Sequence, residues 1–461
     1  MFRHQTTARR ALPAAALALA FTFSGGLLVS TPGHSASAAE PRAAASLAGA
    51  AAAPAGGPQI TTQHWRGLLS YARGSWSGVV PNLHGSLQLR PFGPLPTREY
   101  TDPFGAGAAK KYSYGSWTSP IVRTGYPIDE AVASWNATTP TGTFVETTFR
   151  GKLADGSWTK WYVLGRWASG DDFAAGDIHR TSLDGQGDDD ATVYTDTFSA
   201  RTGKEPVAYQ SRVTLLKPLG SKTSPTLDGL STMTSELLSK TAPPTSTFTL
   251  GRSVELDVPP YAQNIHRGEY PEFGGGGEVW CSPTSSSMVL GYWAKKNPKY
   301  GVPASELVGI DAPNGDPVVP YAAINTWDYT YEGSGNWPFN TAYTHRFGMN
   351  SFVTRLRSLA EAEKFIAAGI PVITSQSWKL ADMPEAGYAS NGHLMVLIGF
   401  TAAGDPIMND PAANSDADVR SVYTRHNFEK IWQQSTGGVV YVNVPPGTKL
   451  PANSPGLTPN W

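Results

Sequence analysis

Cys281 is the residue of this chain best suited to nucleophilic chemistry, and it is the only cysteine among 461 residues. It follows the glycines 274–277 and Trp280, and it opens the segment Cys281-Ser282-Pro283-Thr284, which is typical of a helix start. A thiol at a helix N-terminus lies where the helix dipole favours the nucleophilic thiolate. A lone cysteine is also compatible with a small buried apolar residue. The flanking sequence favours the nucleophile.

A cysteine nucleophile requires a base, and His393 is the best candidate. The tripeptide Asn391-Gly392-His393 precedes the most apolar run of the chain, Leu394 to Ile398, which is typical of a strand. A histidine at a strand start and directly after a glycine can face a cleft. His393 lies 112 residues beyond Cys281, as expected for partners that meet in space and not in sequence.

Asp410 is the candidate that would orient His393, and Asn409 is the alternative. The run Thr401 to Gly404 predicts a hairpin with an even-length loop. In such a hairpin, residues whose numbers sum to an odd value share a face of the sheet. His393 and Asp410 satisfy this condition and His393 and Asn409 do not. A bulge or an odd-length loop would reverse the choice.

Gln263 is the candidate donor to an oxyanion, together with the backbone N–H of Cys281. Taken alone, Gln263 is also compatible with a surface amide. We interpret the other histidines of this region, His266, His345 and His426, as solvated residues, although His266, close after Gln263, could also line the cleft. No spacing of His, Cys and Asp matches a zinc site, so the sequence predicts neither a catalytic metal nor a cofactor.

Four sequence blocks in a fixed order resemble a papain-fold cysteine peptidase. The similarity is to the bacteriocin-leader-processing peptidases, in their stand-alone branch without a transporter, and it spans about residues 254–445. It implies Cys281 as nucleophile, His393 as base, Asp410 as orienting residue and Gln263 as oxyanion donor. The four blocks are Val258-Pro259-Pro260-Tyr261-Ala262-Gln263, Trp280-Cys281-Ser282-Pro283-Thr284-Ser285, Gly392-His393-Leu394-Met395-Val396 and Asn409-Asp410-Pro411.

The chain departs from the family pattern in two respects. Ser282 stands where glycine is the commoner residue, which puts the close approach of a substrate to the backbone in question. In addition, no membrane or ATPase region is present, so leader cleavage coupled to export is not implied.

The predicted function is a secreted cysteine peptidase that hydrolyses peptide bonds through an acyl-enzyme intermediate. Two alternatives stay open. One is a papain-like binding protein that no longer catalyses. The other is an acyl- or amide-transferring enzyme, because an amine can intercept the thioester in place of water.

The elements that must position these residues lie within residues 252–448. Helices are predicted at Cys281–Lys296 and Arg355–Ala368. Helices that precede antiparallel strands favour an α+β domain. The predicted strands are Pro371–Thr374, Leu394–Phe400, Pro406–Met408 and Gly438–Val442.

Residues 58–218 carry short β-type runs separated by turn signals such as Asp155-Gly156. The chain is therefore predicted to be multidomain, with an N-terminal all-β sandwich followed by an α+β papain-like cysteine peptidase domain. Five tryptophans of the first domain suggest a sugar-stacking platform, or a sandwich core that most of them fill, and the core is favoured. They are Trp117, Trp135, Trp158, Trp161 and Trp167.

The remaining segments are predicted from composition. Residues 40–57 are rich in Ala, Pro and Gly and indicate a disordered spacer. Residues 219–251 are rich in Ser, Thr and Pro and indicate an interdomain linker, with one short helical patch at Met233–Leu238. The Pro-rich tail, residues 449–461, is expected to fray.

Residues 1–39 predict a signal peptide and hence a secreted, extracellular protein. A basic head with Arg3, Arg9 and Arg10 precedes the apolar stretch Ala11–Val29 and the small-residue cleavage motif Ala36-Ser37-Ala38. Removal of three arginines lowers the 36 Lys and Arg to 33 against 37 Asp and Glu. This mild acidity argues against nucleic acid or an anionic membrane as partner.

The expected partner is a peptide or protein substrate, and the candidate ligand of the N-terminal domain is the cell wall or a polysaccharide. No later segment is long and apolar enough to span a bilayer once the signal is removed. We expect a monomer.

Overall fold

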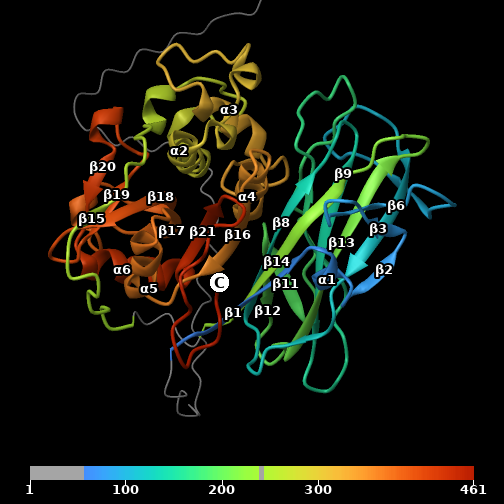
Figure 1. The fold of residues 1–461 in the computed structure, drawn as a ribbon, viewed down its shortest axis with the longest axis horizontal. Helices are drawn as coiled ribbons and strands as arrows, with labels where there is room; N and C mark the ends of the chain where they lie inside the picture. Colours follow the sequence, from blue (N-terminus) through green and yellow to red (C-terminus); the bar gives the residue numbers. More distant parts are fainter. Residues whose placement is uncertain (1–56, 238–242) are drawn as a thin grey trace, which may run out of the picture. The chain divides into compact units, whose positions relative to one another are not determined.

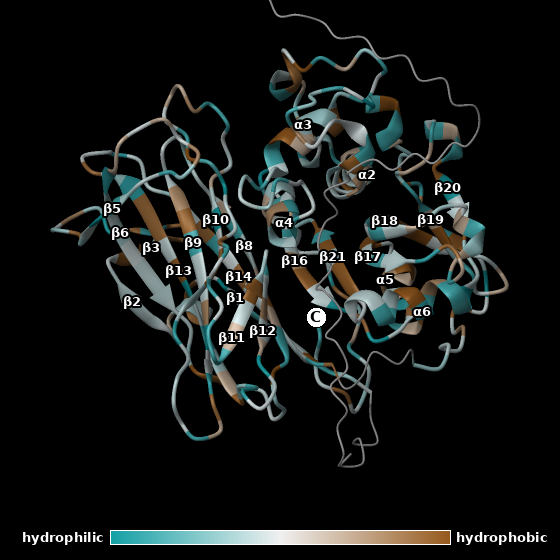
Figure 2. Cartoon of the chain, turned by 180° about the vertical axis from the view of Figure 1, so that it is seen from behind, coloured by the Kyte–Doolittle hydropathy of each residue, from teal (hydrophilic) through white to brown (hydrophobic). Residues whose placement is uncertain are grey.

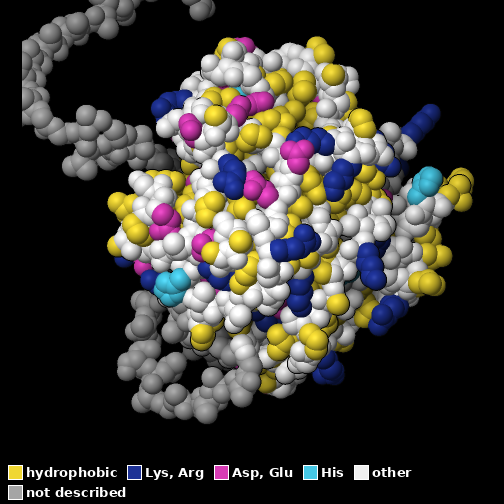
Figure 3. Space-filling view, turned by 60° about the vertical axis from the view of Figure 1, so that its left-hand side comes forward, with side chains coloured by type: hydrophobic (Ala, Val, Ile, Leu, Met, Phe, Trp, Pro, Cys, Tyr) yellow, Lys and Arg dark blue, Asp and Glu magenta, His cyan; other side chains and the backbone are white. Residues whose placement is uncertain are grey.

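The computed structural model describes residues 57–237 and 243–461. These residues all belong to one compact unit. The predicted signal peptide and residues 40–56 of the predicted spacer lie outside the described residues. Within the described ranges, no helix has both the length and the apolar character needed to cross a membrane. The molecular face in Figure 3 carries acidic, basic and apolar side chains side by side.

The N-terminal β-rich region contains two antiparallel sheets (Figure 1). The strands of the first sheet follow the order β11-β12-β8-β14-β4-β3, with β1 paired to β14. Those of the second follow the order β10-β9-β13-β6-β2, with β5 paired to β6 and β7 to β13. The elements are β1 (Gln59–Arg66), α1 (Leu68–Tyr71), β2 (Ser75–Ser77), β3 (Val79–Pro81), β4 (Leu87–Leu89), β5 (Thr97–Tyr100), β6 (Lys110–Thr118), β7 (Val122–Arg123), β8 (Glu130–Thr138), β9 (Phe144–Lys152), β10 (Tyr162–Trp167), β11 (Ala191–Tyr194), β12 (Thr197–Ala200), β13 (Ala208–Pro218) and β14 (Thr226–Glu236).

The two sheets pack face to face through aromatic side chains. The ring of Phe149 on β9 lies 4.7 Å from that of Phe198 on β12. Hydrophobic residues accordingly recur along the central strands β9 and β13 (Figure 2). The core interpretation of the tryptophans is confirmed for Trp117, Trp135 and Trp167, which are fully buried. Trp158 and Trp161 are only half-buried and lie outside this core.

The linker prediction for residues 219–251 is wrong, because β14 lies inside it and pairs with β8 on one side and β1 on the other. The predicted helical patch at Met233–Leu238 is wrong for the same reason over residues 233–236, and Leu238 lies outside the described residues. Leu227, Leu230 and Met233 of β14 are buried in the core. The Ser and Thr residues of this segment suggested a linker, but Thr also fits the pleated surface of a sheet well.

The C-terminal region is built on a third sheet, with strand order β16-β21-β17-β18-β19-β20 and β15 paired to β18. All its pairings are antiparallel. The strands are β15 (Val254–Glu255), β16 (Asn350–Arg355), β17 (Val372–Trp378), β18 (Ser390–Phe400), β19 (Pro406–Asn409), β20 (Arg420–Val422) and β21 (Val439–Val444). The helices are α2 (Cys281–Lys296), α3 (Val318–Thr326), α4 (Trp337–His345), α5 (Leu359–Ala367) and α6 (Arg425–Thr436).

The helix predicted at Cys281–Lys296 is confirmed by α2. The helix predicted at Arg355–Ala368 begins later, at Leu359, because Arg355 is the last residue of β16. Ser358 accepts a hydrogen bond from the backbone N–H of Glu361 and so caps α5. The four predicted strands are present as β17, β18, β19 and β21.

Strand β16 lies at the edge of the third sheet, and side chains of β8 satisfy its outer backbone groups. Asn136 donates to the carbonyl oxygen of Ser351 (2.7 Å) and accepts from its N–H (3.0 Å). The N–H of Val353 donates to Ser134 Oγ (3.1 Å). Side chains of the β-rich region therefore provide the partners that an edge strand otherwise lacks.

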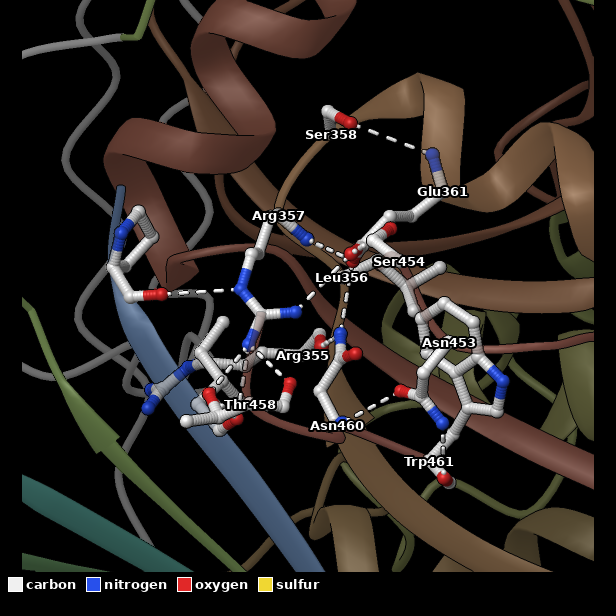
Figure 4. Close-up of polar contacts among 12 residues, drawn as sticks. Arg355, Leu356, Arg357, Ser358, Glu361, Asn453, Ser454, Thr458, Asn460 and Trp461 are labelled. Atoms are coloured by element: carbon white, nitrogen blue, oxygen red, sulfur yellow. Dashed lines mark hydrogen bonds and ion pairs between the residues drawn. The ribbon is translucent and has the colours of Figure 1, made fainter. Parts of the chain in front are cut away.

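The expectation that the C-terminal tail frays is wrong (Figure 4). Asn460 is fully buried, and its amide donates to the carbonyl oxygen of Arg355 (2.7 Å) and to Glu361 (2.9 Å). The guanidinium of Arg357 binds both the carbonyl oxygen of Thr458 (2.7 Å) and that of Ile60 in β1 (3.0 Å). Polar side chains thus satisfy the tail backbone, which composition could not reveal.

We expect Asn460→Ala to lower the free energy of unfolding by about 1–3 kcal/mol, because it leaves the buried carbonyl of Arg355 without this donor. The measurement is chemical denaturation of the full chain. Lys449→Ala, at an exposed position of the same tail, is the matched control and should leave stability unchanged. Equal stability of the two variants would contradict the docking of the tail.

Candidate active site

Cys281 is the first residue of α2 and is buried, with 7% of its surface exposed. The preceding Trp280 is held by a hydrogen bond from its indole to the carbonyl oxygen of Phe273 (2.8 Å). Close packing requires the last of the preceding glycines, since a Cβ at Gly277 would collide with the carbonyl oxygen of Gln263. The nucleophile candidate therefore sits at the positive end of a helix dipole.

His393 on β18 and Asp410 directly after β19 form a buried pair, with 2.8 Å between Nε2 and Oδ1. The loop at the turn has an odd length, because Phe400 pairs with Pro406. A bulge between Leu397 and Gly399 then shifts the register back by one residue. Both deviations that would have reversed the choice of Asp410 thus occur, and they cancel.

Asn409, the alternative orienting residue, is not brought to His393. Its amide nitrogen donates to the carbonyl oxygens of Val258 (3.4 Å) and Pro259 (3.3 Å). Asn409 therefore anchors the segment that leads to Gln263.

The carboxylate of Asp410 accepts four hydrogen bonds. Oδ1 accepts from His393 and from the backbone N–H of Ala412 (2.9 Å). Oδ2 accepts from the hydroxyls of Tyr388 (2.8 Å) and Tyr423 (2.6 Å). Sequence reasoning missed both tyrosines, because they belong to segments that meet Asp410 only through the fold.

The protonation of His393 is set by two opposed effects. Burial lowers its pKa, but the charge of Asp410 and side-chain hydrogen bonds with Asp410 and Cys281 raise it more, so the net shift is upward. Burial likewise raises the pKa of Asp410, yet His393 and the other donors hold it below the ordinary aspartate value. The geometry therefore favours an imidazolium between a carboxylate and the thiol.

Two aromatic rings enclose His393. Trp378 and Tyr388 present edge-to-face contacts to its ring, at centroid distances of 5.6 and 5.8 Å. The indole of Trp378 also donates to the carbonyl oxygen of Tyr388 (2.7 Å). These rings shield the histidine–carboxylate bond from water, which strengthens it.

Gln263 is buried and lies beside the segment that leads to the nucleophile, so the surface-amide interpretation is wrong. Its amide nitrogen donates to the carbonyl oxygen of Glu278 (2.8 Å), and its backbone N–H donates to that of Pro411 (2.7 Å). Gln263 thereby connects the region before Cys281 with the residue after Asp410. The side-chain amide of Gln263 has two N–H donors. One of them binds the carbonyl oxygen of Glu278, and the other remains available to a further acceptor.

Ser282, the departure from the family pattern, is fully buried, and its hydroxyl lies 3.0 Å from that of Tyr441 on β21. Helix α2 forms without the glycine. The solvated interpretation is wrong for His266, which is fully buried and lies 2.8 Å from Glu269. It is also wrong for His345, which pairs with Asp228 at 3.0 Å and is only 13% exposed.

Comparison with known families covers both regions of the chain. Residues 61–235 match the Peptidase C39 N-terminal domain, and residues 255–440 match the Peptidase_C39 like family. Together the matched regions cover most of the chain. The protein combines a β-rich N-terminal domain with a C39-like peptidase domain. It belongs to the C39 cysteine peptidase family, which confirms the resemblance carried by the four sequence blocks.

One solved structure similar to this chain is a proposed C39-like peptidase from Bacillus anthracis. It shares 18% sequence identity, covers 41% of this chain and 97% of its own, and has a TM-score of 0.26. No curated protein matches the chain. The family assignment therefore rests on the two domain matches.

We expect His393 to remain protonated as the pH rises past about 6.5, the ordinary histidine value. Since its folded pKa is raised, the stability it contributes is complete below that pH and is lost as the pH rises through the folded pKa. In Asp410→Asn the carboxylate charge no longer opposes the effect of burial on the imidazole, so the titration midpoint of His393 should fall. NMR titration of the imidazole checks this. Asp418→Asn, at an exposed position, should titrate like the wild type.

We expect Tyr388→Phe and Tyr423→Phe each to lower the free energy of unfolding by about 1–3 kcal/mol, because each removes a hydrogen bond to a charged group. The double variant should lose more than the sum, since Oδ2 of Asp410 then keeps neither hydroxyl donor. Chemical denaturation of the four proteins in the cycle measures the coupling. Strict additivity would contradict a shared carboxylate oxygen.

Proposed function

We propose that this protein is a secreted cysteine peptidase that hydrolyses peptide bonds through an acyl-enzyme intermediate, within a papain-like α+β domain. The observation that carries the proposal is the buried pair of His393 and Asp410, with 2.8 Å between Nε2 and Oδ1, together with Cys281, whose interaction with His393 helps to raise the pKa of that histidine. Secretion rests on the N-terminal sequence alone.

The proposed hydrolysis assigns one role to each of Cys281, His393 and Asp410. Cys281 gives its proton to His393, and the thiolate sulfur attacks the peptide carbonyl carbon. The carbonyl π electrons move to oxygen, and His393 returns the proton to the leaving amine nitrogen as the C–N bond breaks. Water, deprotonated by His393, then releases the acid and restores the thiol. Asp410 stays ionised and orients the imidazole throughout.

The oxyanion would be held by the backbone N–H of Cys281 and the remaining N–H of Gln263. The first N–H groups of a helix have no intrahelical acceptor, so that of Cys281 is free to donate to the substrate. Gln263 is fixed by its bond to Glu278, which limits its reorganisation during the reaction.

The test is peptide-library cleavage by the full chain beside its variants. Cys281→Ala should abolish cleavage, and Gln263→Ala should lower kcat by about 10²–10³ while some activity persists. Gln434→Ala, a half-buried glutamine on α6, is the control and should cleave like the wild type. Equal cleavage by the wild type and Cys281→Ala would overturn the proposal.

The alternatives are outcomes of the same assay. If an added amine yields an amide product in preference to the acid, the enzyme transfers acyl groups. If the wild type cleaves no peptide and Cys281 is alkylated at an ordinary thiol rate that ignores pH between about 5 and 8, the domain binds without catalysing.

A further inference from the structure

Cations and indole rings alternate along the outer face of the second sheet. The guanidinium of Arg150 lies 4.2 Å from the ring of Trp158 and 4.6 Å from that of Trp161. Arg212 continues the series at 4.1 Å from Trp161, and Lys152 begins it at 5.7 Å from Trp158. We call these five residues the cation–indole stack. All five are half-buried.

Local structure accounts for the stack. Arg150 and Lys152 lie on β9, and Gln210 and Arg212 lie on the adjacent β13 with Gln210 opposite Arg150. A turn at Gly156, whose φ is +90°, returns the chain so that Trp158 bridges back to Lys152. Trp158 and Trp161 are the two of the five tryptophans considered for the sandwich core that are only half-buried.

The stack carries positive charge that the described residues do not neutralise. Arg150, Lys152 and Arg212 form no ion pair within residues 57–237 and 243–461. Burial first, and the charge of Arg150 second, lower the pKa of Arg212. Further along the same face the situation differs, because Glu146 pairs with both Arg98 (3.0 Å) and Arg166 (2.7 Å).

The guanidinium groups keep donors free. Arg150 uses Nε and Nη2 on Gln210 Oε1, and Arg212 uses Nε on Thr118 Oγ1. No described residue accepts from Nη1 of Arg150 or from either Nη of Arg212. Indole rings cover the flat faces of the two guanidinium groups, so the guanidinium edges remain available to an anion. The edge of a guanidinium matches the two oxygens of a carboxylate.

We propose that the cation–indole stack binds a linear acidic glycan built from uronic acids. The charge is complementary, and the repeated cations suit a polymer with an anion on each sugar. In a uronic acid the carboxylate belongs to the ring itself. One sugar can therefore contact an indole and an adjacent guanidinium at the spacing of the stack. The proposal does not depend on catalysis by Cys281.

The experiment measures binding of the full chain to oligogalacturonate, with dextran as the uncharged polymer. Arg150→Gln combined with Arg212→Gln should weaken binding by at least about tenfold, because charged hydrogen bonds are lost. Arg73→Gln combined with Lys222→Gln, at two exposed positions, makes the same change of charge and should bind like the wild type. Thermal melts verify folding, and Arg212→Gln alone is the milder variant if the double variant unfolds.

Three results would overturn the assignment. Equal binding of dextran and oligogalacturonate would remove the role of charge. An equal loss of binding in the variant with both Arg73→Gln and Lys222→Gln would make the effect one of net charge and not of the stack. Tighter binding of single-stranded oligothymidylate than of oligogalacturonate would identify a nucleic-acid surface instead.

Discussion

Asp410 is a buried negative charge, and the geometry of the site depends on how that charge is compensated. Moving a carboxylate out of water is costly unless every lone pair finds a donor. Here the donors come from His393, Ala412, Tyr388 and Tyr423, which belong to separate segments around β18, β19 and β20. The compensated charge fixes the imidazole in turn, and it raises the pKa of His393.

The same principle of satisfying buried polar groups joins the two regions of the chain. The edge strand β16 takes its partners from Asn136 and Ser134, and the tail takes its partners from Arg355, Arg357 and Glu361. β16 pairs with β21, which pairs with β17, the neighbour of the strand that carries His393. The β-rich region thus completes the sheet that carries His393.

The outer face of the second sheet illustrates the opposite case. Glu146 compensates two arginines, whereas the cation–indole stack leaves three cations without a carboxylate from the part of the chain that the structure describes. Contacts between cations and indole faces contribute only about 0.5–1 kcal/mol each at exposed sites, so they offset the repulsion without removing the charge. Uncompensated charge held at fixed spacing is the property of a binding surface.

Much of the site follows from local signals. The residue types and the order of the blocks made Cys281, His393 and Asp410 the candidates, and Pro283 with the apolar recurrence after it located α2. The apolar run at Leu394–Ile398 located β18. In the β-rich domain, turn signals predicted a β fold but not its last strand.

What the sequence left undecided depends on contacts between distant residues. Strand β14 gains its stability by pairing with β8 and β1, so its Ser and Thr content alone suggested a linker. The choice of Asp410 over Asn409 depended on a loop length and a bulge that cancel, and neither has a local signature. Tyr388, Tyr423 and the docked tail contribute through hydrogen bonds to partners far along the chain. Sequence determined which groups can react, whereas the tertiary structure decided which of them meet, because burial and pairing are properties of the whole fold.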